Sequence, residues 1–254
     1  MPPTTTPRLS PSATRLSLVG RRAAPGCGVN APAILTSLTA IPRASGSISF
    51  LPPTRRTPTL AFIHGGYWQI NDLVKENFAF FAEGVLPLGI NLAVIEYTLA
   101  PAARLDRIVA EVRRSVRWLA EHLGEYGADP NRLYVSGHSA GGHLTAMTMP
   151  LAEVCGGIAI SGIYDLEPIR LNYLNEKLGL DAAEAERNSP VRDVPANAGE
   201  LVVAYGTREL AELCRQSIEY AQAWTKRVCR GACCRWMVLT TSRSWTRWRD
   251  QRAF

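Results

Sequence analysis

Short apolar runs alternate with amphipathic segments through the middle of the chain. Apolar runs bounded by turn residues indicate buried strands, whereas apolar positions three or four residues apart indicate a helix. Strands are predicted in this way at residues 59–66, 91–97, 132–139, 156–163 and 200–206, and helices at 77–88, 104–123, 140–149 and 209–224. Strands that alternate with helices predict an α/β fold with a mostly parallel sheet and helices on both faces.

The two ends differ in composition from this middle region. Residues 1–56 hold seven arginines and no acidic residue, and residues 227–254 are rich in Arg, Trp and Cys. The formal net charge of +6 belongs to these ends, because the middle of the chain is net acidic. We therefore predict a folded domain over 57–226 between two atypical segments. The first is disordered or out of frame, and a transit peptide is the alternative for it.

Gly137-His138-Ser139-Ala140-Gly141 lies between a predicted strand and a predicted helix. A G-x-S-x-G sequence in that position is typical of a nucleophile elbow, a tight turn that exposes the serine hydroxyl at the edge of the sheet. The backbone N–H of Ala140, at the helix start, is a candidate donor to an oxyanion. A plain glycine turn is the alternative interpretation. If the motif is a nucleophile elbow, Ser139 is the nucleophile.

His64-Gly65-Gly66-Tyr67-Trp68 follows the first predicted strand. Glycines at such a point allow backbone N–H groups to approach a substrate oxygen, so Gly65 and Gly66 are candidates for the oxyanion hole. We predict that His64, Tyr67, Trp68 and the elbow residue His138 border the substrate pocket. Core packing is the alternative for the aromatic side chains.

The acid that orients a catalytic histidine should follow the strand at 200–206. Glu209 lies just beyond its end, and Asp165, which follows the preceding strand, is the rival. Position alone does not decide between them, because a glutamate in the first turn of a helix is also favoured by the helix dipole.

These motifs resemble bacterial arylformamidase, or kynurenine formamidase, in the branch of the α/β-hydrolases that holds the HGG-type esterases. The stretches that carry the resemblance lie within residues 57–225 and read "HGGYW", "EYTLAPAARLDRIVAEVRRSVRWLAEH", "GHSAGGHL", "SGIYDLEPIRLNYLNEKLGLD" and "ELAELCRQSIEYAQAW". The resemblance implies an α/β-hydrolase fold, no metal and no cofactor, and it favours Glu209 over Asp165 as the acid. It implies hydrolysis of N-formylkynurenine to kynurenine and formate through a formyl-enzyme on the serine.

The histidine that this family carries about 30 residues after the acid is missing. The last histidine in the chain is His143, and residues 227–254 contain none. When the codons for "CCRWMVLTTSRSWTRWR" are regrouped by one frame, they can read "LLPLDGLDHFSILDALA", in which a histidine straddles Thr240 and Thr241. Residues 35–51 can likewise be regrouped into a strand-like stretch of the family. We predict two frame errors, and expect residues 227–254 to replace the closing strand, the histidine and a helix.

The sequence therefore predicts a hydrolase by family whose activity is doubtful as written. A carboxylesterase for small aryl or acyl esters and a catalytically dead protein that keeps the pocket are the alternatives. We expect a small-molecule substrate, a cytoplasmic location, and no partnership with nucleic acid or a membrane, since neither basic end shows a nucleic-acid module and no apolar run reaches spanning length. A homodimer is compatible with the sequence.

Overall fold

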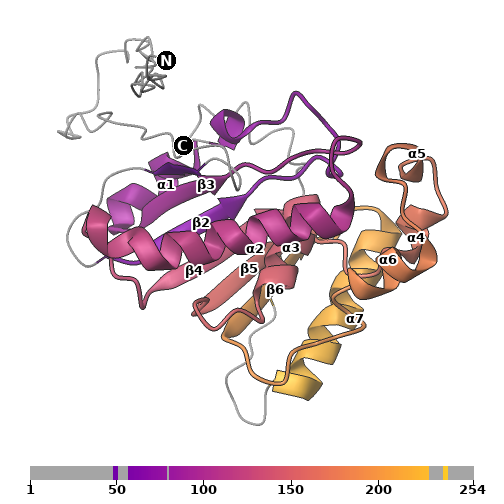
Figure 1. The fold of residues 1–254 in the computed structure, drawn as a ribbon. Coiled ribbons are helices and arrows are strands. Elements are labelled where there is room, and N and C mark those ends of the chain that lie inside the picture. The colour runs from indigo at the N-terminus through magenta and orange to yellow at the C-terminus, as the bar shows by residue number, and fades with distance from the viewer. Residues whose placement is uncertain (1–47, 51–56, 79, 229–236, 240–254) are drawn as a thin grey trace, which may run out of the picture. The chain divides into compact units, whose positions relative to one another are not determined.

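The computed structural model describes residues 48–50, 57–78, 80–228 and 237–239. The chain divides into two units, residues 1–34 and 35–254, and every described residue belongs to the second. Its centre is a sheet with the strand order β1-β3-β2-β4-β5-β6-β7 (Figure 1). All neighbouring strands in it are parallel except β1, which pairs antiparallel with β3.

The five predicted strands are all present, close to their expected positions. They are β2 (Thr59–Ile63), β3 (Asn91–Ile95), β4 (Leu133–His138), β5 (Gly156–Ile160) and β6 (Glu200–Gly206). Because these strands are parallel, their carboxyl ends lie along one edge of the sheet, where open α/β sheets place their ligand sites. The α/β fold class with a mostly parallel sheet is confirmed.

Three helices match the predicted periodicity and cover one face of the sheet. They are α2 (Leu105–His122), α3 (Ala140–Thr148) and α7 (Ala211–Val228). Figure 1 shows α2 crossing in front of the strands, with α3 beside it. The apolar stripe of α2, including Ile108, Val112 and Val116, joins strand residues in the main core cluster. Burial of this stripe is what holds the helix in place, since propensity alone contributes little.

The predicted helix at 77–88 is broken into three short pieces. A 3-10 turn, η1 (Lys75–Phe78), precedes α1 (Phe81–Val85), and a second 3-10 turn, η2 (Leu86–Leu88), follows it. Proline at position 87 has no N–H to continue a helix, and Gly89 ends the segment in the left-handed region. These pieces pack on Phe62, Leu92 and Val94, on the sheet face opposite to α2.

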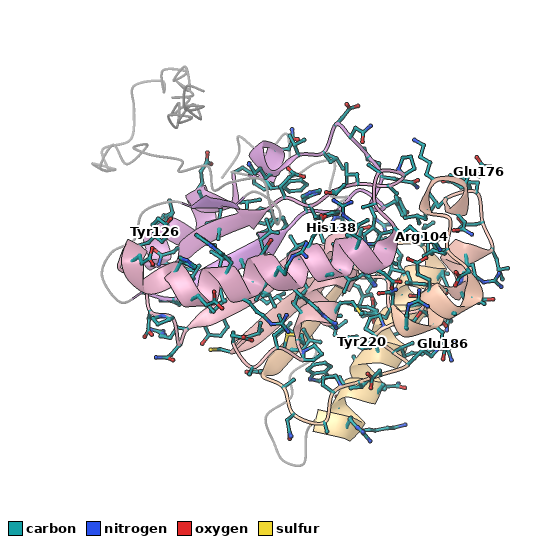
Figure 2. All side chains as sticks on the ribbon, viewed as in Figure 1. Arg104, Tyr126, His138, Glu176, Glu186 and Tyr220 are labelled. Carbon is teal, nitrogen blue, oxygen red and sulfur yellow. The ribbon has the colours of Figure 1, made fainter. Side chains whose placement is uncertain are left out.

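Three short helices that the sequence did not predict lie between β5 and β6. They are α4 (Glu167–Arg170), α5 (Asn175–Leu178) and α6 (Ala182–Arg187), grouped in Figure 1 beyond the N-terminal end of α2. The fully buried carboxylate of Glu184 in α6 accepts hydrogen bonds from Arg104 and from the backbone N–H of Asp106. Arg104, labelled in Figure 2, thereby ties this group to the start of α2.

Two strands occur within the segments that we predicted to be atypical. β1 (Ile48–Phe50) pairs with β3, and β7 (Met237–Leu239) pairs in parallel with β6. The prediction that residues 227–254 contain no closing strand was therefore wrong, because an apolar triplet is enough to extend the β6 edge. The predicted position of the missing histidine, at Thr240 and Thr241, lies outside the described ranges. Nothing in the structure tests the two frame errors, which stay predictions.

Candidate active site

Ser139 lies at a tight turn between β4 and α3. Its backbone has φ 57° and ψ −118°, a conformation that non-glycine residues rarely adopt and that turns at functional sites often hold. Two glycines make the turn possible. A Cβ on Gly137 would lie 2.3 Å from the carbonyl oxygen of Gly141, and one on Gly141 would lie 2.0 Å from that of Ile63. The elbow geometry expected from the G-x-S-x-G sequence is thus present, and Ser139 is partly exposed there.

The HGGYW loop passes directly beside this turn. A Cβ on Gly65 would lie 2.7 Å from the carbonyl oxygen of His138 and 3.4 Å from the Cβ of Ser139, so only glycine permits this approach. Gly66, Tyr67 and Trp68 follow with φ of 109°, 49° and 59°. Three consecutive residues with positive φ turn the loop sharply over the elbow. The two segments in which the sequence placed the nucleophile and the oxyanion hole are therefore neighbours.

The loop is held by its buried histidine. His64 Nε2 lies 2.8 Å from Glu96 Oε1, and the His64 ring stacks on Tyr97 with centroids 4.3 Å apart. The Tyr97 hydroxyl donates to the carbonyl of His64. Burial acts to raise the pKa of Glu96, but the hydrogen bonds from His64 and from the backbone of Lys75 outweigh it and lower that pKa. Glu96 is a residue that sequence reasoning missed.

Two predicted pocket residues, His64 and Trp68, have no exposed surface. Trp68 packs edge-on against His143, with centroids 5.0 Å apart. This burial favours the packing interpretation for both side chains and for Tyr97. Tyr67 is half-buried, as is His138, which Figure 2 labels at the end of β4. These two remain beside the elbow.

Glu209 follows β6, as the sequence predicted, and its carboxylate is held by a serine. Ser161 Oγ donates to Glu209 Oε1 over 2.6 Å. Ser161 has φ 49° and follows β5, and its backbone N–H donates to Ala204 in β6. The other carboxylate oxygen, Oε2, is buried and has no hydrogen-bond partner among the described residues. A buried carboxylate oxygen without a donor is costly, so it points to a partner that the described residues do not supply.

Asp165, the rival acid, is already engaged. Its Oδ1 accepts the backbone N–H of Glu167, and its Oδ2 lies 3.2 Å from Arg192. Both oxygens of Asp165 are therefore engaged at the start of α4, while Glu209 keeps one oxygen without a partner among the described residues. Ser161, which sequence reasoning missed, could have been noticed as a small polar residue that directly follows a buried strand.

Neither histidine near Ser139 is suited to act as its base. His143 is fully buried on α3, and its Nε2 donates to the carbonyl of Asn188 over 2.7 Å. Burial lowers the pKa of His143 to about 4, and burial likewise lowers the pKa of His138 to about 4. A general base with so low a pKa is weak at neutral pH.

The described residues contain neither a metal-binding cluster nor a helix suited to span a membrane. No group of three or more His, Cys, Asp or Glu side chains is arranged there to hold a metal ion. None of the helices in these ranges is both long and apolar enough to cross a bilayer.

Comparison with known proteins extends the likeness beyond these motifs. The family model BD-FAE matches residues 50–155. Kynurenine formamidase of Salmo salar is 35% identical over 179 residues, which cover 65% of this chain and 59% of that protein. Kynurenine formamidase of Danio rerio is 34% identical over the same length, again with 59% of its own chain covered. The chain thus spans less than two thirds of these relatives.

Solved structures show the same fold. A structure from Silicibacter sp. described as a thioesterase has a TM-score of 0.68 and 25% identity, covering 79% of this chain and 74% of that one. A thermophilic esterase from Thermogutta terrifontis with bound propionate has a TM-score of 0.64 and 22% identity, covering 78% and 79%. The chain therefore has the fold of these hydrolase structures, and it is similar in sequence to the kynurenine formamidases.

Proposed function

We propose that this chain is a serine hydrolase of aryl formamides, the substrate class of N-formylkynurenine, and that it lacks its general base in the sequence as written. The observation that carries the proposal is the buried Oε2 of Glu209, which has no partner among the described residues. The other oxygen, Oε1, accepts from Ser161, and the residue follows β6 at the sheet edge where Ser139 follows β4. In a serine triad the acid accepts the Nδ1–H of a histidine, which is the donor that Glu209 Oε2 would need.

The reaction would proceed by acyl transfer through Ser139. Its Oγ attacks the formyl carbon while a histidine takes the hydroxyl proton, and the amide oxygen becomes an oxyanion. The backbone N–H groups of Gly65, Gly66 and Ala140 would stabilise that charge, because the first N–H groups of α3 have no partner within the helix. Collapse breaks the C–N bond, and the histidine gives its proton to the leaving aryl amine. Water then hydrolyses the formyl-enzyme to formate and free Ser139.

Without the histidine, the chain as written should turn over very slowly. Losing one member of a triad removes several orders of magnitude in rate, since the oxyanion hole and substrate binding act alone. The histidines at 138 and 143 do not replace it, given their low pKa values. We propose that the natural gene supplies a histidine after Glu209 in another reading frame.

Two other functions have specific support. The likeness to esterase structures favours hydrolysis of small aryl or acyl esters as the first alternative. The absence of any histidine after residue 143 favours a protein that binds a formamide without cleaving it. A small-molecule ligand is common to all three proposals.

The first experiment is to sequence the coding DNA across codons 45–60 and 220–245, and to express the chain both as written and with each frame corrected. Hydrolysis of N-formylkynurenine and of p-nitrophenyl acetate is then measured for both chains. We expect the corrected chain to cleave the formamide about 10⁴-fold faster than the chain as written, and Ser139→Ala in the corrected chain to abolish the gain.

Two substitutions in the corrected chain test the choice of acid. Glu209→Gln should lower kcat by about 10³- to 10⁴-fold, and Asp165→Asn, the matched control, by less than about tenfold. If the chain as written and the frame-corrected chain cleave the formamide at equal rates, the missing-base proposal is refuted. Turnover of the ester alone would refute the formamidase proposal, and tight formamide binding without turnover in both chains would support the binding protein.

A further inference from the structure

A basic cavity lies between α2, the C-terminal part of α3 and the segment that follows α6. Three arginines of one helix face, Arg113, Arg114 and Arg117, line it together with Arg187 from the end of α6. The cavity has a volume of about 490 Å³, within the range of sites that hold small metabolites. This arginine cluster was not singled out by the sequence.

The arginines of this cavity exceed the carboxylates that could neutralise them. Arg187 is held by both oxygens of Asp106, with Nε–O distances of 3.0 and 3.1 Å. Asp193 is the second acid in the lining. Arg113 and Arg114 form no ion pair within the described part of the chain, and Arg117 lies 3.9 Å from Glu153. Asp193 interacts electrostatically with Arg113, but four arginines against two aspartates still leave the lining with two positive charges in excess.

Such a grouping is unfavourable without an anion. Arg113 and Arg117 are four residues apart on α2, and like charges at that spacing destabilise a helix. Arg113 is half-buried and donates its Nε–H to the carbonyl of Met147 over 2.8 Å, which fixes the direction of its guanidinium group. Burial and the nearby Arg117 lower the pKa of Arg113, and together they outweigh Asp193, which raises it. A bound anion would offset the repulsion between Arg113 and Arg117 and would favour the charged form of Arg113.

We propose that this cavity binds a small phosphomonoester. Guanidinium groups bind phosphate oxygens in pairs of parallel hydrogen bonds, and a dianion would match the two unneutralised charges. Asn188 and Ser189 add polar groups, and the rest of the lining is apolar without an aromatic side chain on which a nucleobase could stack: Val109, Ala110, Ala146, Met147, Pro150 and Pro190. This lining fits a short alkyl or sugar phosphate better than a nucleotide.

The site is separate from the proposed catalytic residues and does not depend on their roles. It contacts α3 at Ala146 and Met147, whereas Ser139 precedes the first residue of that helix. Seven or eight residues along a helix correspond to about 12 Å. Asn188 lines the cavity, and its carbonyl oxygen accepts a hydrogen bond from His143 of α3. It therefore links the cavity to the helix that begins at the nucleophile elbow.

Isothermal titration of the full chain with glycerol 3-phosphate tests the proposal, at constant ionic strength because surface charge interactions are screened by salt. We expect saturable binding with one site per chain. The double substitution Arg114→Gln/Arg117→Gln should weaken it at least tenfold. The control Arg132→Gln/Lys226→Gln removes the same charge from exposed positions outside the cavity and should leave the Kd unchanged.

Three outcomes would overturn the proposal. They are no saturation at 10 mM ligand (about the weakest useful affinity), equal weakening by the two double variants, and binding of succinate as tight as that of the phosphomonoester. Inorganic phosphate distinguishes the source of affinity, and it should bind more weakly because it cannot contact the aliphatic walls. Circular dichroism of each variant checks the fold, which the exposed positions of Arg114 and Arg117 should leave intact.

Discussion

The two faces of the central sheet are covered very differently. On the face under α2, α3 and α7, strand residues such as Ile63, Val135 and Ala159 have no exposed surface. On the opposite face, the α1 region covers Phe62, Leu92 and Val94, and this is the hydrophobic cluster that the described residues form there. Tyr134 of β4 is 39% exposed and Ile158 of β5 is 42% exposed, although both belong to central strands.

The exposed residues Tyr134 and Ile158, with the half-buried Val202 of β6, form what we call the open face. They share one side because side chains alternate along a strand and the register pairs Ile158 with Val202. Parallel sheets are normally covered on both faces. The contrast shows that the described residues leave part of this face without a cover.

The largest difference between the faces should appear on truncation of an isoleucine. Ile108 of α2 is fully buried against the covered face, so Ile108→Ala should lower the free energy of unfolding by about 2–5 kcal/mol. Ile158→Ala removes the same atoms from the open face and should cost less than about 1 kcal/mol. Urea denaturation of both variants measures the difference. Equal losses would mean that Ile158 is buried in solution.

A second difference concerns a buried histidine on the covered face. The pKa of His143 is lowered by burial to about 4, whereas an unfolded histidine binds its proton near pH 6.5. Between these values the unfolded chain binds more protons, so stability is complete above pH 6.5 and falls as the pH drops to 4. The loss from this residue should be roughly 3 kcal/mol.

Urea denaturation at several pH values between 4 and 8 follows this loss. His143→Gln should remove its share of the pH dependence, while the part due to His138, whose pKa is also lowered, remains. His122→Gln, on the outer part of α2, is the matched histidine control. An unchanged pH profile in His143→Gln would contradict the assignment, as would the same change in both variants.

The strands and the long helices of the covered face were predicted well from the sequence. Its strands and the long helices α2 and α7 have clear apolar periods, and their positions place the ends of β4 and β6 at one edge. The candidate site was proposed from local motifs, and the structure places Ser139 and Gly65 in adjacent turns whose glycines are sterically required. The acid could be placed only by position and resemblance.

Features that depend on tertiary contacts were not predictable from local sequence. Ser161 orients Glu209 across 48 positions of chain, and Glu96 reaches His64 across 32. The helices α4, α5 and α6 are too short to show a period. The strand β7 was missed because three apolar residues carry no periodic signal, and only the free edge of β6 makes them a strand.

Correcting the reading frame should bring a modest gain in stability at the open face. If the corrected end supplies a cover, Tyr134 and Ile158 become buried, and Ile158→Ala should then cost about 2 kcal/mol more than it does in the chain as written. The free energy of unfolding is measured for both chains, each with and without Ile158→Ala. The difference between the two losses isolates the effect of the cover on Ile158, because other effects of the new residues cancel. Ile108→Ala, measured in both chains, is the control and should cost the same in each. If Ile158→Ala costs the same in both chains, the corrected end does not cover this face. The exposure of Tyr134 and Ile158 would then be a property of the fold itself.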